Sequence, residues 1–357
     1  VAEVDGNRRS LRGALVQWEH PDFSLAPAMS QIDLIRKLTS LGERFPLGQK
    51  YLIAVSGGRD SVALLDALVA IGYRKLIICH LDHRLRGRDS TADARFVAAL
   101  GKRHWLTVDS DSADVPGLAK QEQLSVETAA RLARHRFFFA AAARHRCKRI
   151  FLAHHADDQV ESVLMHLFRG SGLKGLSGMA EQSPMPPPPG STARSPIQLI
   201  RPMLAIPRSE IDAYLKTRDL KWREDASNES SEHLRNRVRS VLVPELHNIF
   251  QRDVRPMVQR LAAIVAEDED YLSEIADQAL ADVTIELTSL SASKLRSLHP
   301  ALQRRVLQKW FAVQKISGVG FLEIESTRQL LTSSSPSKIN LPNNRHVRRR
   351  SGRIFIE

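Results

Sequence analysis

The feature of the sequence that most restricts its fold is an alternation of short apolar runs with longer segments of helical periodicity. Compact apolar runs occur at residues 51–55, 76–80, 105–109 and 149–153, and helical patterns at 62–71, 126–146 and 157–168. Strands that alternate with helices predict a parallel sheet covered by helices on both faces. Ligands of such sheets bind at the carboxyl ends of the strands. We therefore expect an α/β domain whose site lies where these strands end.

Two segments do not follow this alternating pattern. Residues 1–28 show no periodicity and predict a poorly ordered extension. The run 183–196 contains Met-Pro-Pro-Pro-Pro-Gly, which predicts an exposed loop or insertion. We place the α/β domain at 29–243.

Residues 244–357 predict a second, smaller domain that is mostly helical. An apolar stripe along 257–280, opposite a run of acidic residues, predicts an amphipathic helix. At the end of the chain, 338–357 predicts two short strands around an Asn343-Asn344 turn.

The charge of the chain predicts a polyanionic partner. The 357 residues carry a net charge of +12, and arginines cluster along the whole length. Such clusters suit a large nucleic acid better than a small anion, although solubility alone is the other interpretation. The two cysteines, Cys79 and Cys147, have no CxxC spacing, which indicates a reducing compartment. Because no apolar run is long enough to span a bilayer, we expect a cytoplasmic protein with no membrane partner.

A loop rich in glycine and serine joins the first predicted strand to its helix. It consists of Ser56, Gly57, Gly58, Arg59, Asp60 and Ser61. The glycines let backbone N–H groups approach a phosphate, and the helix start and the hydroxyls add further donors. A carboxylate at Asp60 would repel that phosphate unless a metal ion bridges them, which implies Mg²⁺. The loop lacks the Gly-Lys-Ser/Thr of a Walker A motif, and an ordinary capped turn is the alternative.

A second polar motif, His-His-Ala-Asp-Asp-Gln at 154–159, follows the fourth predicted strand. Three interpretations are open: a metal cluster, a polar helix cap, or side chains that enter the same site as the loop. In the third, these histidines and aspartates would hold Mg²⁺, position ATP and accept a proton from an attacking amine. Consecutive side chains cannot all face one ligand, so we expect only two or three of them to be functional.

Arginines complete the candidate site. In the helical pattern at 126–146, Glu127, Arg131 and Arg134 share one face, either as part of a site or as a surface ion pair. Further arginines, which form either a phosphate-facing stripe or a solvated face, are Arg223, Arg235 and Arg239.

Taken in order, these motifs resemble the tRNA(Ile)-lysidine synthetase family. The first loop alone resembles only the ATP loop of the N-type ATP pyrophosphatases, the PP-loop superfamily. The full series is Ser-Gly-Gly-x-Asp-Ser at 56–61, His-Leu-Asp-His-Arg-Leu-Arg at 80–86, Ala-Arg-Leu-Ala-Arg at 130–134, His-His-x-Asp-Asp-Gln at 154–159, Arg-Gly-Ser-Gly-Leu-Lys-Gly-Leu at 169–176, Arg-Pro-Met-Leu at 201–204, and Trp-Arg-Glu-Asp-x-Ser-Asn at 222–228. The resemblance runs from residue 50 to 239 and continues more weakly toward the C-terminus.

The resemblance implies an ATP pyrophosphatase domain of the adenine nucleotide alpha hydrolase-like fold and a defined reaction. The family adenylates the C2 oxygen of the wobble cytidine in a tRNA(Ile) that bears a CAU anticodon. Free L-lysine then displaces AMP to give lysidine. ATP and Mg²⁺ are the implied cofactors, the tRNA and L-lysine are the implied partners, and a homodimer is compatible with the sequence.

The resemblance also implies roles for individual residues. Residues 56–61 match the family's ATP loop, with Asp60 as its essential acid and the metal ligand. Arg131, His154 and Asp158 match residues that the family uses around ATP and the reacting base. Together with the charge pattern, this predicts that the tRNA is contacted by Arg134, Arg223, Arg235, Arg239, Arg348, Arg349 and Arg350.

Two positions depart from the family pattern, and one other function competes. His135 stands where the family often has tyrosine, and Ser162 stands where it usually has threonine. A tRNA sulfurtransferase would share the ATP loop and the tRNA partner, but it needs cysteines to carry sulfur. Cys79 lies within a predicted strand and Cys147 at the end of a predicted helix, so neither is well placed for this.

Overall fold

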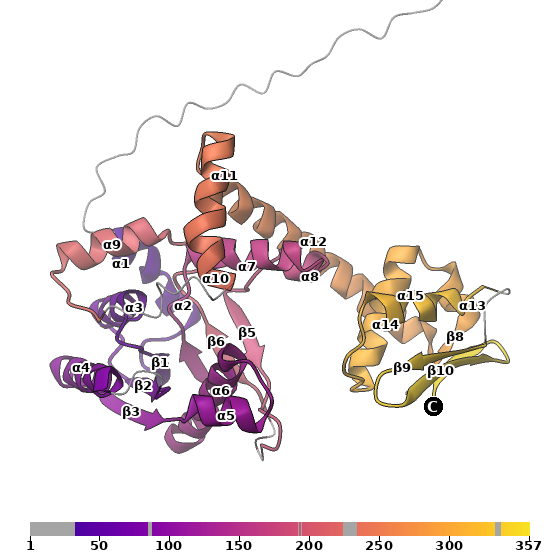
Figure 1. Ribbon diagram of the computed structural model, residues 1–357, viewed down its shortest axis with the longest axis horizontal. Helices are drawn as coiled ribbons and strands as arrows, with labels where there is room; N and C mark the ends of the chain where they lie inside the picture. Colours follow the sequence, from indigo (N-terminus) through magenta and orange to yellow (C-terminus); the bar gives the residue numbers. More distant parts are fainter. Residues whose placement is uncertain (1–32, 85–87, 192, 194, 224–233, 333–336) are drawn as a thin grey trace, which may run out of the picture.

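The computed structural model describes residues 33–84, 88–191, 193, 195–223, 234–332 and 337–357. They form an N-terminal lobe and a C-terminal lobe that one long helix connects (Figure 1). The predicted extension at 1–28 lies outside the described residues.

A six-stranded sheet forms the centre of the N-terminal lobe, in the order β3-β2-β1-β4-β6-β5. Its strands are β1 (Tyr51–Ala54), β2 (Leu76–Asp82), β3 (Thr107–Ser112), β4 (Arg149–Phe151), β5 (Gln182–Met185) and β6 (Ile197–Ile200). All neighbours are parallel except β5 and β6, which confirms the predicted parallel sheet. The strand order reverses between β1 and β4, and this switch point is where such sheets bind ligands.

Helices cover both faces of this sheet, as the alternating pattern predicts. The side chains of β1 show why: Tyr51 and Ile53 enter one apolar core, and Leu52 enters the core on the opposite face. The helices of the lobe are α1 (Asp33–Thr39), α2 (Leu41–Arg44), α3 (Arg59–Ala70), α4 (Arg88–His104), α5 (Val115–Gln121), α6 (Val126–His145), α7 (Ala156–Phe168), α8 (Leu173–Leu176), α9 (Arg208–Thr217), α10 (Leu234–Arg237), the π-helix η2 (Val238–Leu242) and α11 (Val243–Phe250).

One expectation needs correction within the proline-rich run. Residues 183–185 are not loop, because they belong to strand β5 at the edge of the sheet. An edge strand tolerates Pro184, since only one of its sides needs backbone donors.

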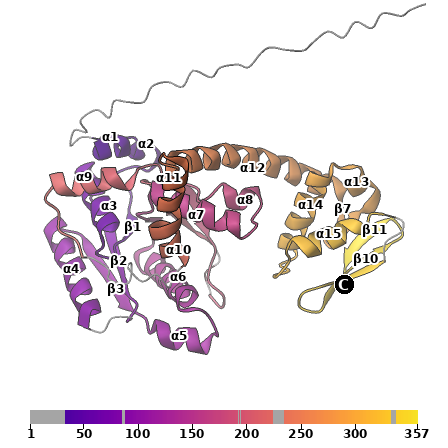
Figure 2. The same cartoon turned by 45° about the horizontal axis from the view of Figure 1, so that its top comes forward.

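Helix α12 (Arg255–Val283) connects the two lobes (Figure 2). Its 29 residues span about 43 Å at 1.5 Å per residue. It packs against α7 and α8 of the N-terminal lobe and then against α14 (Pro300–Val313) of the C-terminal lobe. Two ion pairs reinforce the second contact, Arg305 with Glu269 at 2.7 Å and Lys309 with Asp277 at 2.7 Å.

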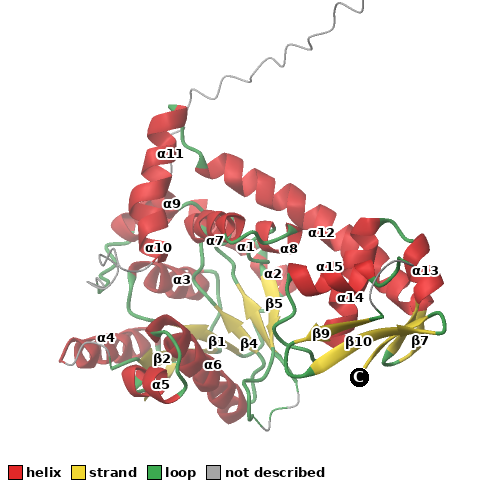
Figure 3. Ribbon diagram, turned by 45° about the vertical axis from the view of Figure 1, so that its right-hand side comes forward, coloured by secondary structure: helices red, strands yellow, loops and turns green. Residues whose placement is uncertain are grey.

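The C-terminal lobe contains more sheet than the single predicted hairpin. Five antiparallel strands run in the order β7-β8-β11-β10-β9 beside the helices (Figure 3). The elements are β7 (Thr284–Glu286), β8 (Ser289–Ser291), α13 (Ala292–Ser297), α14, α15 (Phe321–Gln329), β9 (Lys338–Leu341), β10 (Arg345–Arg350) and β11 (Arg353–Ile356). Trp310, Phe311, Val347 and Ile354 are among the side chains of its core.

Among the described helices, none combines the length and the apolar character needed to cross a membrane.

Candidate active site

The glycine- and serine-rich loop lies between β1 and α3, at the switch point of the sheet. Gly57 has a φ of +92°, which strains any residue with a Cβ. The Ser56 hydroxyl accepts a hydrogen bond from the Gly58 N–H at 3.2 Å, and the Ser61 hydroxyl donates to the Gly58 carbonyl at 2.8 Å. These contacts hold the loop in a fixed turn and leave the first N–H groups of α3 for an anion.

Asp60 lies in the first turn of α3 and faces His155. Its Oδ2 is 3.6 Å from Nε2 of His155. Burial alone would raise the pKa of Asp60, but His155, Arg208 and Arg59 lower it below its usual range. Its Oδ1 is buried and has no hydrogen-bond partner in the part of the chain that the structure describes. An ionised carboxylate with one unpaired oxygen beside a phosphate loop fits a divalent cation.

The motif at 154–159 begins α7 at the adjacent strand end, so the structure brings it next to the loop. His155 is the N-cap: its Nδ1 accepts from the Asp157 N–H at 3.2 Å, and the Asp158 carboxylate accepts from the His155 N–H at 3.0 Å. Asp158 also lies 3.5 Å from Nε2 of His155. His155 and Asp158 therefore form a helix cap that also reaches Asp60. No group of three metal-ligating side chains occurs among the described residues, so the metal-cluster interpretation finds no support there.

His154 differs from His155 because arginine side chains surround it. Burial lowers its pKa to about 4, and Arg201, Arg235 and Arg134 lower it against the opposing effect of Asp158. Its Nδ1 is buried without a partner. A neutral imidazole with this pKa is a weak base toward an ammonium group, whose pKa is near 10.4. Its free nitrogen suits a hydrogen bond to a ligand better than removal of a proton.

A basic cluster adjoins His154 and consists of Arg131, Arg134, Arg201 and Arg235. Burial and then the charge of Arg131 lower the pKa of Arg201. Burial lowers the pKa of Arg134, and so do Arg131 and Arg235, although the residue keeps an accessible surface. Cations that depress one another's pKa favour an anion between them.

Two members of this neighbourhood were not predicted as site residues. Arg201 donates to the Ala180 carbonyl at 2.8 Å and to the Ser183 hydroxyl at 3.0 Å, and its Nε is buried without a partner. His83 follows β2 and also has a buried, unpartnered Nδ1. Both lie in motifs that the sequence shows plainly, but only the fold brings Arg201 near His154 and His83 near Arg134.

The neutral histidines make stability depend on pH. Burial, Arg134 and His80 lower the pKa of His83 to about 4, against Asp82, which matches the value for His154. Their ordinary value is 6.5, so between about pH 4 and 6.5 the unfolded chain binds more protons. Stability should therefore rise as the pH rises through this window. We expect His154→Gln to reduce the difference in thermal midpoint between pH 5.0 and 7.0. The exposed His247→Gln is the control, and equal slopes in the two variants would contradict this assignment.

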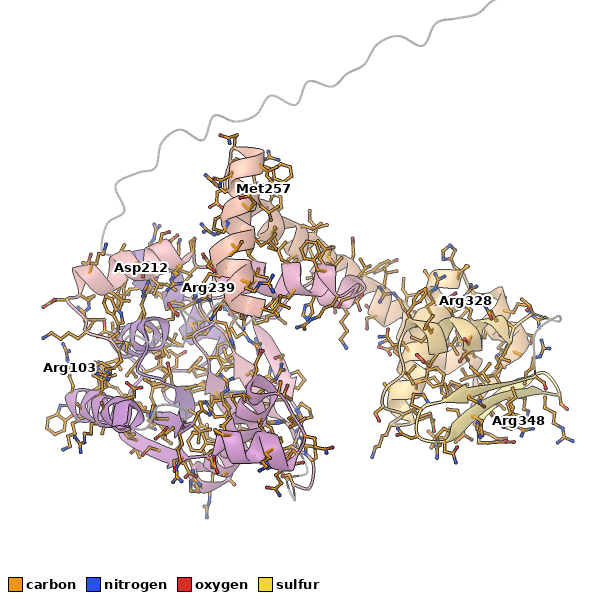
Figure 4. All side chains as sticks on the ribbon, viewed as in Figure 1. Arg103, Asp212, Arg239, Met257, Arg328 and Arg348 are labelled. Carbon is orange, nitrogen blue, oxygen red and sulfur yellow. The ribbon has the colours of Figure 1, made fainter. Side chains whose placement is uncertain are left out.

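Arg235 and Arg239 meet a buried carboxylate on α7. Glu161 is 2% exposed and accepts from Arg235 Nε at 2.8 Å and from Arg239 Nε at 2.5 Å. The structure therefore engages both arginines within the protein, although a third of each side chain stays accessible. They join α10 and the π-helix η2 to α7 beside Asp158. Figure 4 labels Arg239 at this junction.

The guanidinium groups of Arg59 and Arg223 point to other elements of the protein. Arg59 donates to Asp212 of α9 at 2.9 Å and lies 5.7 Å from the ring centroid of Trp222. Arg223 donates from Nε to Asp93 of α4 at 2.8 Å. Arg59 can therefore serve the loop through its backbone N–H rather than its side chain. The acidic part of the Arg-Glu-Asp motif lies outside the described residues.

The predicted arginines of β10 lie in the C-terminal lobe, away from the loop (Figure 4). Arg348 forms an ion pair with Glu357 at 2.7 Å, and Arg349 donates to the Thr332 carbonyl. Arg350 is exposed and has no ion pair or side-chain hydrogen bond among the described residues.

Comparison with known proteins finds two family models that match the chain. Residues 31–246 match a family model described as a PP-loop domain, and residues 290–355 match one described as the TilS substrate binding domain. In the solved structures, the U34-tRNA thiolase NcsA of Methanococcus maripaludis shares the fold, with a TM-score of 0.50 and 17% identity over 66% of this chain and 80% of its own.

Curated relatives match along most of the chain. The tRNA(Ile)-lysidine synthase of Geobacter sulfurreducens is 37% identical over 89% of this chain and 67% of its own length. That of Thermosynechococcus vestitus is 34% identical over 85% of each chain, and that of Bacillus subtilis is 35% identical over 73% of this chain and 54% of its own. The alignments with these three thus span between 54% and 85% of the relatives' lengths. The chain belongs to the tRNA(Ile)-lysidine synthase family.

Proposed function

We propose that the protein ligates L-lysine to C2 of the wobble cytidine of a tRNA(Ile) with a CAU anticodon. In the first step the C2 oxygen attacks the α-phosphorus of ATP, and pyrophosphate leaves. In the second step an amine of lysine attacks C2, and AMP leaves with the oxygen. The relatives' names support the overall reaction, and the residues of this chain support the individual roles.

The ATP loop and Asp60 suit the first step. The N–H groups at the start of α3 would bind phosphate oxygens, and the unpaired Oδ1 of Asp60 would hold Mg²⁺ against them. Bound Mg²⁺ would neutralise phosphate charge and help pyrophosphate to leave. The basic cluster would stabilise negative charge that develops on the transferred phosphate.

The second step needs a neutral amine at C2. The free nitrogen of His154 would orient the base or the amine by a hydrogen bond, since its pKa of about 4 disfavours a role as proton acceptor. The carboxylate of Asp158 lies next to the same site and would attract the lysine ammonium.

The alternative, a tRNA sulfurtransferase, is disfavoured by both cysteines. Cys79 and Cys147 are buried in the core between the sheet and α6. Burial and the nearby Asp109 raise the pKa of the Cys79 thiol to about 12, so it is not a thiolate near neutral pH.

The observation that carries the proposal is the set of buried polar atoms at the ends of adjacent strands, on Asp60, His83, His154 and Arg201, that have no partner among the described residues. Native proteins leave few such atoms without a reason, and a polar ligand would satisfy them together. The test is incubation with ATP, labelled lysine and the CAU-anticodon tRNA(Ile). We expect acid-precipitable label, AMP and pyrophosphate that depend on tRNA and Mg²⁺. Formation of ADP and phosphate would refute the proposal.

We further propose that the C-terminal lobe grips the tRNA through phosphates. Among the described residues, the exposed arginines of β10 that form no ion pair or side-chain hydrogen bond are Arg345 and Arg350, whereas Arg348 and Arg349 are engaged within the lobe. Each phosphate contact contributes about 0.7–0.9 to the salt slope of binding. Replacing Arg345 and Arg350 together by alanine should therefore lower the magnitude of the slope by about 1.5, with little change in turnover at saturating tRNA.

The matched control for this experiment is Arg353→Ala. Arg353 lies on the adjacent strand and is paired with Glu286 at 2.9 Å. Binding should be measured across a series of salt concentrations. If the double variant kept the wild-type slope, the two arginines would not touch the tRNA.

A further inference from the structure

The segment that follows α9 crosses the ATP loop at residues 222–223. The Arg223 N–H donates to the Gly57 carbonyl at 2.9 Å. Gly57 is enclosed on its other side by α4. A Cβ on Gly57 would lie 3.4 Å from Phe96, 3.6 Å from Val97 and 3.8 Å from Cγ of Arg223. The glycine with φ of +92° is thus held between α4 and this segment.

One ion pair and one cation–π contact hold this segment in place, one on each flank of the loop. Arg223 is bonded to Asp93, which lies on α4 one turn before Phe96 and Val97. Arg59, the first residue of α3, is bonded to Asp212 and lies over the ring of Trp222. We name Asp93, Arg223, Arg59, Asp212 and Trp222 the loop clamp. Figure 4 labels Asp212 on α9, the element that supplies one end of it.

We propose that the loop clamp holds the ATP loop in its binding conformation, with Asp93 as a positioning residue for ATP. The bond to the Gly57 carbonyl fixes that peptide, and so it fixes the direction of the N–H groups that follow. Asp93 reaches the nucleotide only through Arg223 and the loop. The inference rests on the proposed function in one respect, that the ligand of the loop is ATP.

The ion pair between Arg223 and Asp93 is too accessible to matter much for folding. Their side chains are 41% and 20% exposed, and pairs of this kind contribute little to stability. A small misplacement of the groups that position a substrate, by contrast, can cost about 10²-fold in rate. Loss of the Asp93 carboxylate should therefore affect ATP binding far more than stability, which a merely structural role would not produce.

The test is the Kd for ATP without tRNA, measured by calorimetry on the full chain. We expect Asp93→Ala to weaken ATP binding by about tenfold with a thermal midpoint close to that of the wild type. Asp93→Asn keeps an oxygen that can accept from Arg223, so we expect a smaller loss. The control is Glu122→Ala, which removes another accessible arginine–carboxylate pair, with Arg136 at 3.2 Å, and should leave the Kd unchanged. In steady-state turnover, Asp93→Ala should raise the KM for ATP and leave the KM for tRNA unchanged.

The outcomes separate the clamp from the proposed function. If wild type and Asp93→Ala bound ATP within twofold of each other, the clamp would be overturned and the function would stand. If only the KM for tRNA changed, Asp93 would serve the tRNA site, and the clamp would again be wrong. A wild-type protein that bound no ATP would overturn both. Should Asp93→Ala not fold, Asp93→Asn is judged by the same twofold criterion.

Discussion

Replacing Asp60 by asparagine should slow AMP formation by about 10²–10³-fold, the usual effect of removing one preorganised electrostatic contact. The substitution keeps the volume of the side chain but removes the charge that lies beside the phosphate loop. His155, Arg208 and Arg59 keep the pKa of Asp60 low, so the wild-type group is ionised throughout the neutral range. Its unpaired Oδ1 is the atom that would hold the metal ion. The measurement is the single-turnover rate of AMP formation at saturating ATP, tRNA and Mg²⁺.

The matched control for Asp60 lies on the same helix. Asp66 is buried and accepts from the Tyr214 hydroxyl at 2.6 Å and from Arg218 Nε at 3.1 Å. We expect Asp66→Asn to lower the thermal midpoint and to leave the rate of AMP formation unchanged. Asp60→Asn should lower that rate and leave the thermal midpoint unchanged. A near-normal rate in Asp60→Asn would remove this carboxylate from the mechanism.

The sheet and the position of the site could be predicted because both depend on local patterns. Apolar runs of strand length and helices with one apolar face imply a parallel sheet, and two polar motifs directly after strands imply a shared site. The structure confirms the sheet and places Asp60 beside His155. The choice between His154 and His155 could not be predicted. The turn at a helix start points consecutive side chains in different directions, so one caps α7 and the other faces the basic cluster.

The partners of the arginines were beyond prediction for a different reason. Arg59 and Asp212 are 153 positions apart in the sequence, and Arg223 and Asp93 are 130 apart. Nothing in the local pattern distinguishes an arginine that meets a carboxylate across the fold from one that faces a phosphate. The C-terminal sheet was missed in part because β7 and β8 are three residues long, too short to show an alternating pattern.

Glu161→Gln should produce a large loss of stability, because it leaves Arg235 and Arg239 with only the more distant Asp158 carboxylate, at 3.9 and 3.5 Å, as a counter-charge. Breaking a buried ion pair by removing one partner costs about 3–5 kcal/mol. Both arginines are about one-third accessible, so water would compensate them in part, and we expect the lower end, about 3 kcal/mol. The matched control is Glu325→Gln. Glu325 also binds two arginines, Arg304 and Arg328, but it is more accessible than Glu161, at 18% against 3% of the side chain.

The control should lose about 1 kcal/mol or less, as accessible pairs do. The measurement is the urea midpoint of each variant at neutral pH, with hydrogen exchange in α7 and α10 as the local readout. Faster exchange should appear in these helices for Glu161→Gln and should be absent for Glu325→Gln. If both substitutions destabilised the protein equally, the burial of Glu161 would give it no larger contribution to stability than Glu325 makes. Other contacts would then hold the junction of α7 with α10.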